Sequence, residues 1–548
     1  MNRTLILKAD SLLSKEKGTI YKEHGGRITV CLVYPDTYRV GMSNLGFQGI
    51  YGLLNKRDDV VCERAFLPDE DDRDEYRRTA TPVFSLESKT PLHRFDIVAF
   101  SVSFENDYPN IARILDMAKI PFLCTDRNSY HPLIIGGGVF AFFNPEPLAP
   151  ALDIIFIGEA EESLNEFIDT YRDGSDREDV KRKALCIEGV YVPGFYCVEY
   201  NEDGTPARRT ALYGAPEKIT RRYLKDLSRS PITTAIVTPE AEFSDMYLVE
   251  AMRGCPWACR FCLVGHIYNP VRKKGRVQIM AEIRTAQQHA RKVGVIGPSL
   301  TDYPYIEDVL CMEGVSFSIT SLRASERSAG LMQLLKGNRS ISIAPEAGTE
   351  RMRRVINKKI TEKDIMDTAG LIFASGIENL RLYFMIGLPA ETHEDIAGIV
   401  ELVEKVRAIS PRGNIVLSVS TFIPKPFTPF QWHPMEPLAS VKGKLKFIKK
   451  SLKGMKGIRV LHDLPKSAPM QGFFSNGDRR AAKVVQAMAK GNDWLSACAA
   501  AEVDSNFYVY RKKDLHEIMP WDFIETGVTK EALRKEYRKA LSLSGDLL

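Results

Sequence analysis

Three cysteines, Cys255, Cys259 and Cys262, lie in one short run with the spacing C-x3-C-x2-C. Three thiolates this close can ligate three irons of a four-iron, four-sulfur (4Fe-4S) cluster, whose fourth iron then stays open for a substrate or cofactor. A structural zinc site is the alternative, but zinc usually takes four protein ligands arranged in two pairs. No second pair follows, and His266 is the only nearby candidate for a fourth ligand. The spacing therefore favours a cluster over zinc.

In this spacing, and in the aromatic Phe261 before the last cysteine, the run resembles the signature of the radical S-adenosylmethionine (radical SAM) superfamily. The resemblance implies that the three cysteines are metal ligands of a 4Fe-4S cluster and that S-adenosylmethionine chelates the open iron. An electron from the reduced cluster would then release a 5′-deoxyadenosyl radical, so that the cofactors carry the chemistry and the protein supplies position. The resemblance also implies that Phe261 lies against the adenine, although an ordinary core position would suit this ring equally.

Residues 244–435 alternate short apolar runs with helical segments. Strands are expected at Met246–Ala251, Val293–Gly297, Val315–Thr320, Ser340–Ala344, Asn379–Ile386 and Ile415–Ile423. Because helical crossovers between parallel strands are right-handed, this pattern predicts a partial (β/α)6 TIM-type barrel, the fold of the superfamily that the cysteines resemble. Working groups in such barrels follow the carboxyl ends of strands, and the cysteine run follows the first strand.

The same rule nominates residues after the later strands: Gly297–Asp302, Ser321–Arg323, Pro345–Arg351 and Gly387–Pro389. The segment 345–351 resembles the P-x-x-G-S/T-E/D-R element of cobalamin-associated and methylthiotransferase radical SAM enzymes. In those enzymes an acidic or amide side chain and a neighbouring hydroxyl reach the cofactor. Arg323, Glu346 and Thr349 are therefore further candidates for cofactor binding, and strand-end caps or surface ion pairs are the alternative.

Residues 1–200 have a different α/β pattern, with strands expected at Arg27–Tyr34, Phe95–Ser103, Pro132–Ile135 and Asp153–Gly158. This pattern predicts a Rossmann-like, doubly wound domain whose ligand lies at the carboxyl ends of the strands. The residues expected there are Asp36, Tyr38, Gly41, Ser101, Ser103, Gly136 and Gly137.

The order of these residues resembles the D-x-H-x-x-G, S-x-L and G-G pattern of cobalamin-binding domains, and the resemblance implies cobalamin as a third cofactor. Tyr38 departs from the pattern, because it stands where the cobalt-ligating histidine would be. Glycines at 136 and 137 would let a corrin tail approach the backbone, or they form only a tight turn. A vestigial sheet used for docking or substrate capture is the alternative to cobalamin binding.

The remaining segments have weaker signals. Residues 201–243 are expected to form a hairpin and linker, residues 436–548 a small, mainly helical domain, and Asp69–Asp72 a solvated loop. Lys442–Arg459 carries eight Lys or Arg and no acid, with apolar residues at helical spacing. Such a face could attract nucleic acid, but without interleaved aromatic residues solvated surface is favoured.

The composition suits an enzyme with several domains: 548 residues, 44% hydrophobic and 26% charged, with a net charge of +5. No apolar run is long enough to cross a bilayer, and the first ten residues do not resemble a signal peptide. Seven of the ten cysteines lie outside the run and are scattered without pairing, as expected of reduced thiols in the cytoplasm.

The whole pattern resembles radical SAM proteins that contain a cobalamin-binding domain. The leading hypothesis is a radical SAM enzyme that transfers a methyl group through cobalamin to an unknown substrate and receives electrons from a flavodoxin or ferredoxin. A methylthiotransferase-like or other RNA-modifying radical SAM enzyme without cobalamin is the second hypothesis. A non-catalytic scaffold with a structural metal is the third.

Overall fold

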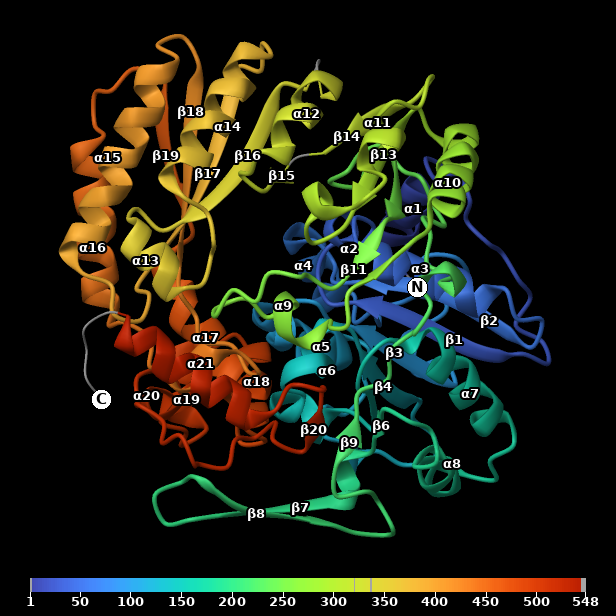
Figure 1. Cartoon of the computed structure of the whole chain (residues 1–548). Coiled ribbons are helices and arrows are strands. Elements are labelled where there is room, and N and C mark those ends of the chain that lie inside the picture. Colours follow the sequence, from blue (N-terminus) through green and yellow to red (C-terminus); the bar gives the residue numbers. More distant parts are fainter. Residues whose placement is uncertain (1, 320, 336–337, 544–548) are drawn as a thin grey trace. The chain divides into compact units, whose positions relative to one another are not determined.

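The fold is taken from a computed structural model, which describes residues 2–319, 321–335 and 338–543 (Figure 1). The chain forms two compact units. Unit 1 contains residues 1–248, 474–505 and 516–526, and unit 2 contains residues 249–473, 506–515 and 527–548. Within the described residues, no helix is long and apolar enough to span a membrane.

Unit 1 is built on a sheet that, in the described part of the chain, has the strand order β2-β1-β3-β4-β5-β6. The strands are β1 Ile28–Tyr34, β2 Val60–Phe66, β3 Ile97–Ser101, β4 Leu133–Gly137, β5 Ile154–Phe156 and β6 Val190–Tyr191. All pair in parallel except β6, which runs antiparallel to β5. β1 is rich in β-branched and apolar residues and its last five residues are buried, as is usual for a parallel strand covered on both faces. A mostly parallel sheet with helical connections is present as predicted, with β2 and β6 as additional strands.

Helices connect these strands: α1 Arg3–Leu13, α2 Tyr38–Gly41, α3 Leu45–Asn55, α4 Glu70–Arg78, α5 Tyr108–Met117, α6 Val139–Phe143, α7 Ala160–Arg172 and α8 Arg177–Ala184. The hairpin expected after residue 200 is present as β7 Tyr196–Tyr200 and β8 Pro206–Ala211. The prediction of a loop at Asp69–Asp72 was wrong, because Asp69 occupies the N-cap position of α4 and the following acids lie in its first turn. Carboxylates are favourable at a helix N-terminus, where the backbone dipole is positive.

The described strands of unit 2 fall into a sheet of order β10-β13-β14 and a parallel sheet of order β15-β16-β17-β18-β19. Their bounds are β10 Met246–Glu250, β13 Lys292–Ile296, β14 Ser316–Ser318, β15 Ser321–Leu322, β16 Ser340–Glu346, β17 Asn379–Ile386, β18 Asn414–Thr421 and β19 Ile458–His462. Each of the six expected strands has a counterpart, although Thr320 lies outside the described residues. β19 was not expected, and the described strands do not close into a barrel.

The helices that follow these strands are α9 Val264–Ile267, α10 Arg276–His289, α11 Ile306–Leu310, α12 Arg327–Leu334, α13 Glu350–Val355, α14 Glu362–Ala374, α15 His393–Ile409 and α16 Leu438–Ser451. Beyond β19 the chain continues mainly as helices α17 Ala468–Asn476, α18 Ala481–Ala489, α19 Trp494–Ala500, α20 Ser505–Val509 and α21 Lys530–Ser542. Capping boxes, made by Thr361 with Asp364 and by Thr392 with Asp395, begin α14 and α15.

A close backbone approach joins the segment after β16 to α15. A Cβ added to Gly348 would lie 2.2 Å from the backbone nitrogen of Ile399, and one added to Gly398 would lie 2.7 Å from Cγ2 of Thr349. Glycine at both positions therefore lets the two backbones pack together.

Replacing Gly348 by alanine should destabilise the protein by about 1–3 kcal/mol, because the new methyl group meets backbone that cannot move aside cheaply. Gly443 in α16 is the matched control, since a Cβ there meets nothing within 4 Å. Thermal unfolding should show a lower Tm for Gly348→Ala and an unchanged or slightly higher Tm for Gly443→Ala. Equal Tm values for the two variants would contradict the close approach.

Candidate functional site

The three cysteines lie on a loop whose two ends are joined. β11 Met252–Arg253 before the loop pairs antiparallel with β12 Arg272–Lys273 after it. Gly254, at a φ of +85°, begins the loop, and a Cβ there would lie 2.6 Å from the carbonyl oxygen of Tyr268. Because few other residues adopt this backbone conformation, glycine makes the sharp entry into the loop possible.

Cys259 is buried, whereas Cys255 and Cys262 are half-buried. Burial raises the pKa of Cys259 to about 11, and the positive charges of Lys358 and Arg323 oppose that rise. Burial also raises the pKa of Cys262, while hydrogen bonds from the backbone N–H groups of Val264 and Gly265 lower it. The N–H of Trp257 acts on Cys255 in the same way.

His266, the one nearby residue that could complete a zinc site, is used elsewhere. Its Nε2 lies 3.2 Å from the carbonyl oxygen of Cys259, to which it donates, and burial lowers the pKa of the imidazole. The neutral imidazole therefore stabilises the loop by donating its Nε2–H to the backbone. Among the described residues no group of three or more His, Cys, Asp or Glu side chains is arranged to hold a metal ion. That finding includes the three thiols of the loop as they stand, and His266 adds no fourth ligand.

Arg260, between the second and third cysteines, fixes the position of the loop. Its side chain is 2% exposed, and Nη1 donates to the carbonyl oxygens of Arg354 (3.0 Å) and Val355 (2.7 Å). Nε and Nη2 donate to Oε2 of Glu536 in α21, at 3.0 and 2.8 Å. The backbone N–H of Arg260 also donates to the carbonyl oxygen of Ile356, at 3.0 Å. The end of α13 and the C-terminal helix therefore hold the cysteine loop together.

Arg323 and Glu346, both nominated from the sequence, lie near the cysteine loop. The Arg323 guanidinium stacks on the ring of Trp257, 3.6 Å from its centroid, and donates to the carbonyl oxygen of Lys358 at 2.6 Å. Glu346 ends β16 with a φ of +67° and accepts a hydrogen bond from Nζ of Lys358 at 3.0 Å. The charge of Glu346 and those of Lys358 and Arg323 all act on the Cys259 thiol, which places these groups around one site.

Thr349 and Phe261 stand apart from that cluster of charges. Thr349 caps α13 by accepting from the N–H of Met352, and its hydroxyl donates to Asp395 of α15. Phe261 is half-buried in the cysteine loop.

Sequence reasoning missed Lys358 and Asp302 as individual site residues. Asp302 accepts from Nε1 of Trp257 at 2.5 Å, and its place after the second expected strand was the available signal.

In unit 1 the structure brings some of the nominated residues together at the carboxyl ends of the strands. Ser101 of β3 is the register partner of Gly137 of β4. Ser103 accepts from Nδ2 of Asn44 at 3.1 Å. A Cβ on Gly136 would lie 2.6 Å from Leu152, whereas one on Gly137 would meet only Cβ of Phe156, at 3.8 Å. Space beside Gly137 is therefore not filled by the chain itself.

Asp36, Tyr38 and Gly41 follow β1, and Tyr38 turns into unit 1. The Tyr38 hydroxyl donates to Oε1 of Glu16 at 2.6 Å, and burial raises its pKa well above the ordinary value. A Cβ on Gly41 would lie 2.4 Å from the ring of Phe66, so this glycine serves internal packing. The carboxylate of Asp36 accepts from the N–H of Thr37.

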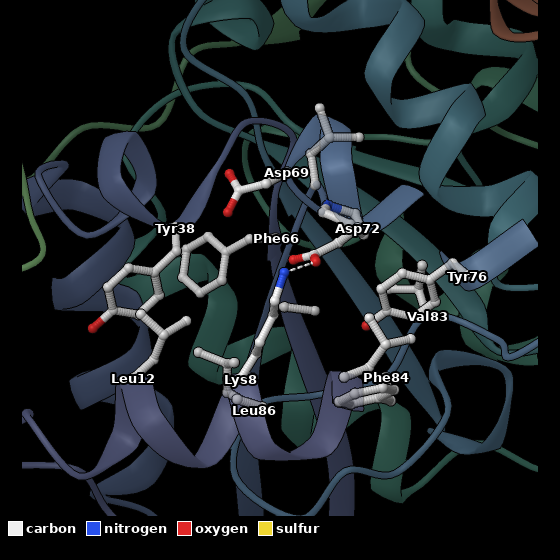
Figure 2. Close-up of a pocket in the computed structure, with 15 residues that line it drawn as sticks. Lys8, Leu12, Tyr38, Phe66, Asp69, Asp72, Tyr76, Val83, Phe84 and Leu86 are labelled. Carbon is white, nitrogen blue, oxygen red and sulfur yellow. Dashed lines mark hydrogen bonds and ion pairs between the residues drawn. The ribbon is translucent and has the colours of Figure 1, made fainter. Parts of the chain in front are cut away.

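Tyr38 also lines a small, mainly apolar pocket under α1 (Figure 2). Lys8 and Asp72 form an ion pair within this pocket, and Phe66 lies beside Tyr38. None of the nominated serines or glycines lines it. No described hydrogen bond joins Tyr38 to Ser101 or Gly137.

Comparisons with known proteins identify the class. Residues 46–193 match the family described as radical SAM proteins, N-terminal, and residues 249–403 match the radical SAM superfamily. The uncharacterized protein MJ0966 of Methanocaldococcus jannaschii is 31% identical over 476 residues, which cover 85% of this chain and 93% of that protein. The chain belongs to the radical SAM superfamily and shares a family with MJ0966. The superfamily implies a 4Fe-4S cluster, S-adenosylmethionine and a source of electrons.

Two more distant similarities cover less of the other protein. The tRNA-2-methylthio-N(6)-dimethylallyladenosine synthase of Acetivibrio thermocellus is 22% identical over 29% of this chain and 37% of that enzyme. The cobalamin-dependent S-adenosylmethionine radical enzyme OxsB, solved with aqua-cobalamin and S-adenosylmethionine, is 15% identical over 89% of this chain and 64% of that chain, with a TM-score of 0.47. The chain therefore spans less than two thirds of each of these enzymes.

Replacing Glu536 by alanine should weaken iron binding about tenfold or more, because Arg260 loses the carboxylate that holds it and the loop is no longer fixed. Iron per chain after anaerobic reconstitution, together with the electron paramagnetic resonance spectrum of the reduced protein, measures the effect. Glu531→Ala in the same helix is the control, since that side chain is 74% exposed. Glu536→Asp should restore part of the loss, and full iron content in Glu536→Ala would contradict this role.

Proposed function

We propose that Cys255, Cys259 and Cys262 hold a 4Fe-4S cluster at which this chain binds and reductively cleaves S-adenosylmethionine. The observation that carries the proposal is a loop with three thiols, of which Cys255 and Cys262 accept backbone N–H hydrogen bonds. Such bonds stabilise sulfur ligands that carry negative charge and are a means of tuning iron-sulfur clusters. The donor set fits a cluster with one open iron better than a closed zinc site. When bound, the cluster and S-adenosylmethionine supply a 5′-deoxyadenosyl radical.

The surrounding side chains would divide three tasks. Lys358 and Arg323 lower the cost of negative charge on the sulfurs, and Glu346 holds the ammonium group of Lys358 in place. The indole N–H of Trp257 donates to Asp302, which fixes the ring, and the guanidinium of Arg323 stacks on that ring. Phe261 is proposed to pack against the adenine, and Thr349 to orient the segment after β16 through Asp395 rather than to touch the cofactor.

Replacing Cys259 by alanine should abolish the release of 5′-deoxyadenosine and lower iron per chain. Cys311, an exposed cysteine outside the loop, supplies the control variant Cys311→Ala, which should keep both. Chromatography of the quenched reaction with dithionite as reductant measures the product. If Cys259→Ala released 5′-deoxyadenosine as fast as the unsubstituted protein, the proposed ligand set would be refuted.

We further propose that unit 1 binds cobalamin at the carboxyl ends of β3 and β4, beside Ser101, Ser103 and Gly137, and that the reaction is methyl transfer. Support comes from the space beside Gly137 and from its pairing with Ser101. Tyr38 does not fit a role as cobalt ligand, because its hydroxyl is bonded to Glu16. The residues therefore fit a corrin whose cobalt takes no side chain at position 38.

Replacing Gly137 by valine should prevent corrin binding by filling the space beside this residue. Gly25, where a Cβ meets nothing within 4 Å, supplies the control Gly25→Val. Protein made in cells grown with vitamin B12 should show a corrin absorbance spectrum, which Gly137→Val loses and Gly25→Val keeps. A corrin-free unsubstituted protein that still releases 5′-deoxyadenosine would reject cobalamin and leave the radical chemistry standing.

Modification of RNA without cobalamin is the second candidate. The similarity to a tRNA methylthiotransferase over 178 residues supports it. A flavodoxin or ferredoxin is proposed as the electron donor in either case. The corrin measurement separates the two candidates, since only the first requires cobalamin.

A further inference from the structure

The exposed side of α16 and the segment after it carry a group of cations, which we call the basic face. Between residues 437 and 462 the sequence has eight Lys or Arg and no Asp or Glu, more positive charge than the net +5 of the whole chain. Seven of these cations are exposed: Lys442, Lys446, Lys449, Lys450, Lys453, Lys456 and Arg459. The positive charge of the chain is thus concentrated here.

None of these seven cations forms an ion pair with any described residue. Neighbouring helices of unit 2 differ in this respect. On α14 Lys363 pairs with Asp367 at 2.5 Å, and on α15 Lys405 pairs with Glu362 at 2.6 Å. Uncompensated cations on one helix, beside helices whose lysines have partners, indicate a surface suited to an anionic partner.

The apolar side of α16 is already covered. Val441, Leu445 and Ile448 are buried, as is Leu452 just beyond the helix. A helix that lies in a membrane interface must offer its apolar face to the lipid, and this face is not free to do so. The basic face can therefore act through charge only, and a polymer of phosphates is the complementary partner.

The basic face begins near the strand ends that carry the candidate site. Lys444 in α16 donates to Glu391 at 2.7 Å, and Glu391 accepts from the N–H of Gly387, directly after β17. From there the cations run along the helix, and Lys442 and Lys450 are about 12 Å apart for a rise of 1.5 Å per residue. A chain of phosphates bound along this face would reach the edge of the sheet at which β17 ends.

We propose that the basic face binds the phosphate backbone of RNA that has a single-stranded loop. The choice of RNA rests on the proposed radical chemistry, because a reacting base must leave its stack and RNA loops present unstacked bases. No exposed aromatic side chain lies among the cations, so contact is to phosphates and not to bases. The basic face holds the RNA, and the loops at the strand ends receive the reacting nucleotide.

The test is the affinity of the full chain for a fluorescent RNA hairpin, measured by anisotropy over a range of salt concentrations. The double variant Lys449→Glu with Lys453→Glu should bind at least about tenfold more weakly, with a salt slope smaller by about 0.7 for each phosphate that the variant no longer neutralises. Lys363→Glu with Lys405→Glu is the matched control, because it reverses two exposed charges on helices of the same sheet. It should bind as the unsubstituted chain does.

Three results would overturn the proposal. Both double variants could bind RNA equally well, a DNA hairpin of the same sequence could bind more tightly than RNA, or vesicles rich in phosphatidylserine could bind in its place. Binding is measured without reductant or S-adenosylmethionine, and Cys259→Ala should bind RNA normally. An unsubstituted chain that binds RNA but releases no 5′-deoxyadenosine would therefore refute only the proposed function.

Discussion

The buried guanidinium of Arg260 is the interaction on which the candidate site depends. Taking a charge out of water costs several kcal/mol unless hydrogen bonds and an opposite charge replace the solvent. Here two carbonyl groups at the end of α13 and the carboxylate of Glu536 do so, at 2.7 to 3.0 Å. Because Arg260 stands between two of the cysteines, satisfying its charge also fixes the loop. The backbone of the loop is therefore fixed beside Arg260, whereas the three thiol side chains are not arranged in this structure to hold a metal ion.

Local patterns predicted the strands and the cysteine loop well, because alternating apolar runs and ligand spacing lie within a few residues of each other. β2 was missed since Glu63 and Arg64 interrupt its apolar run. In the fold both are buried, and Arg64 bridges Glu16 and Glu87, so partners distant in the sequence make a charged strand possible. β19 was missed for a related reason, because it follows a lysine-rich segment that gives no strand signal.

The same limit applies to the site. Arg323 and Glu346, nominated from their position at strand ends, lie near the cysteine loop, but that position could not say where a side chain points. Thr349, at an equivalent position, turns to cap α13 and to bond Asp395. Lys358 follows α13 without any spacing signal, and Glu536 is 276 residues from Arg260. These contacts exist only once the helices have packed, so a single sequence does not reveal them.

Two electrostatic effects act on the pKa values of the three thiols in opposite directions, and their balance bears on metal binding. Burial raises the pKa of Cys255, Cys259 and Cys262, so that without a metal the protonated thiol is the favoured form at neutral pH. Lys358 and Arg323 oppose that effect at Cys259 but do not overcome it. A bound cation supplies the missing stabilisation and displaces the protons, so that metal binding and deprotonation are linked. Free thiolates, which are prone to oxidation, are therefore disfavoured in this loop when no metal is bound.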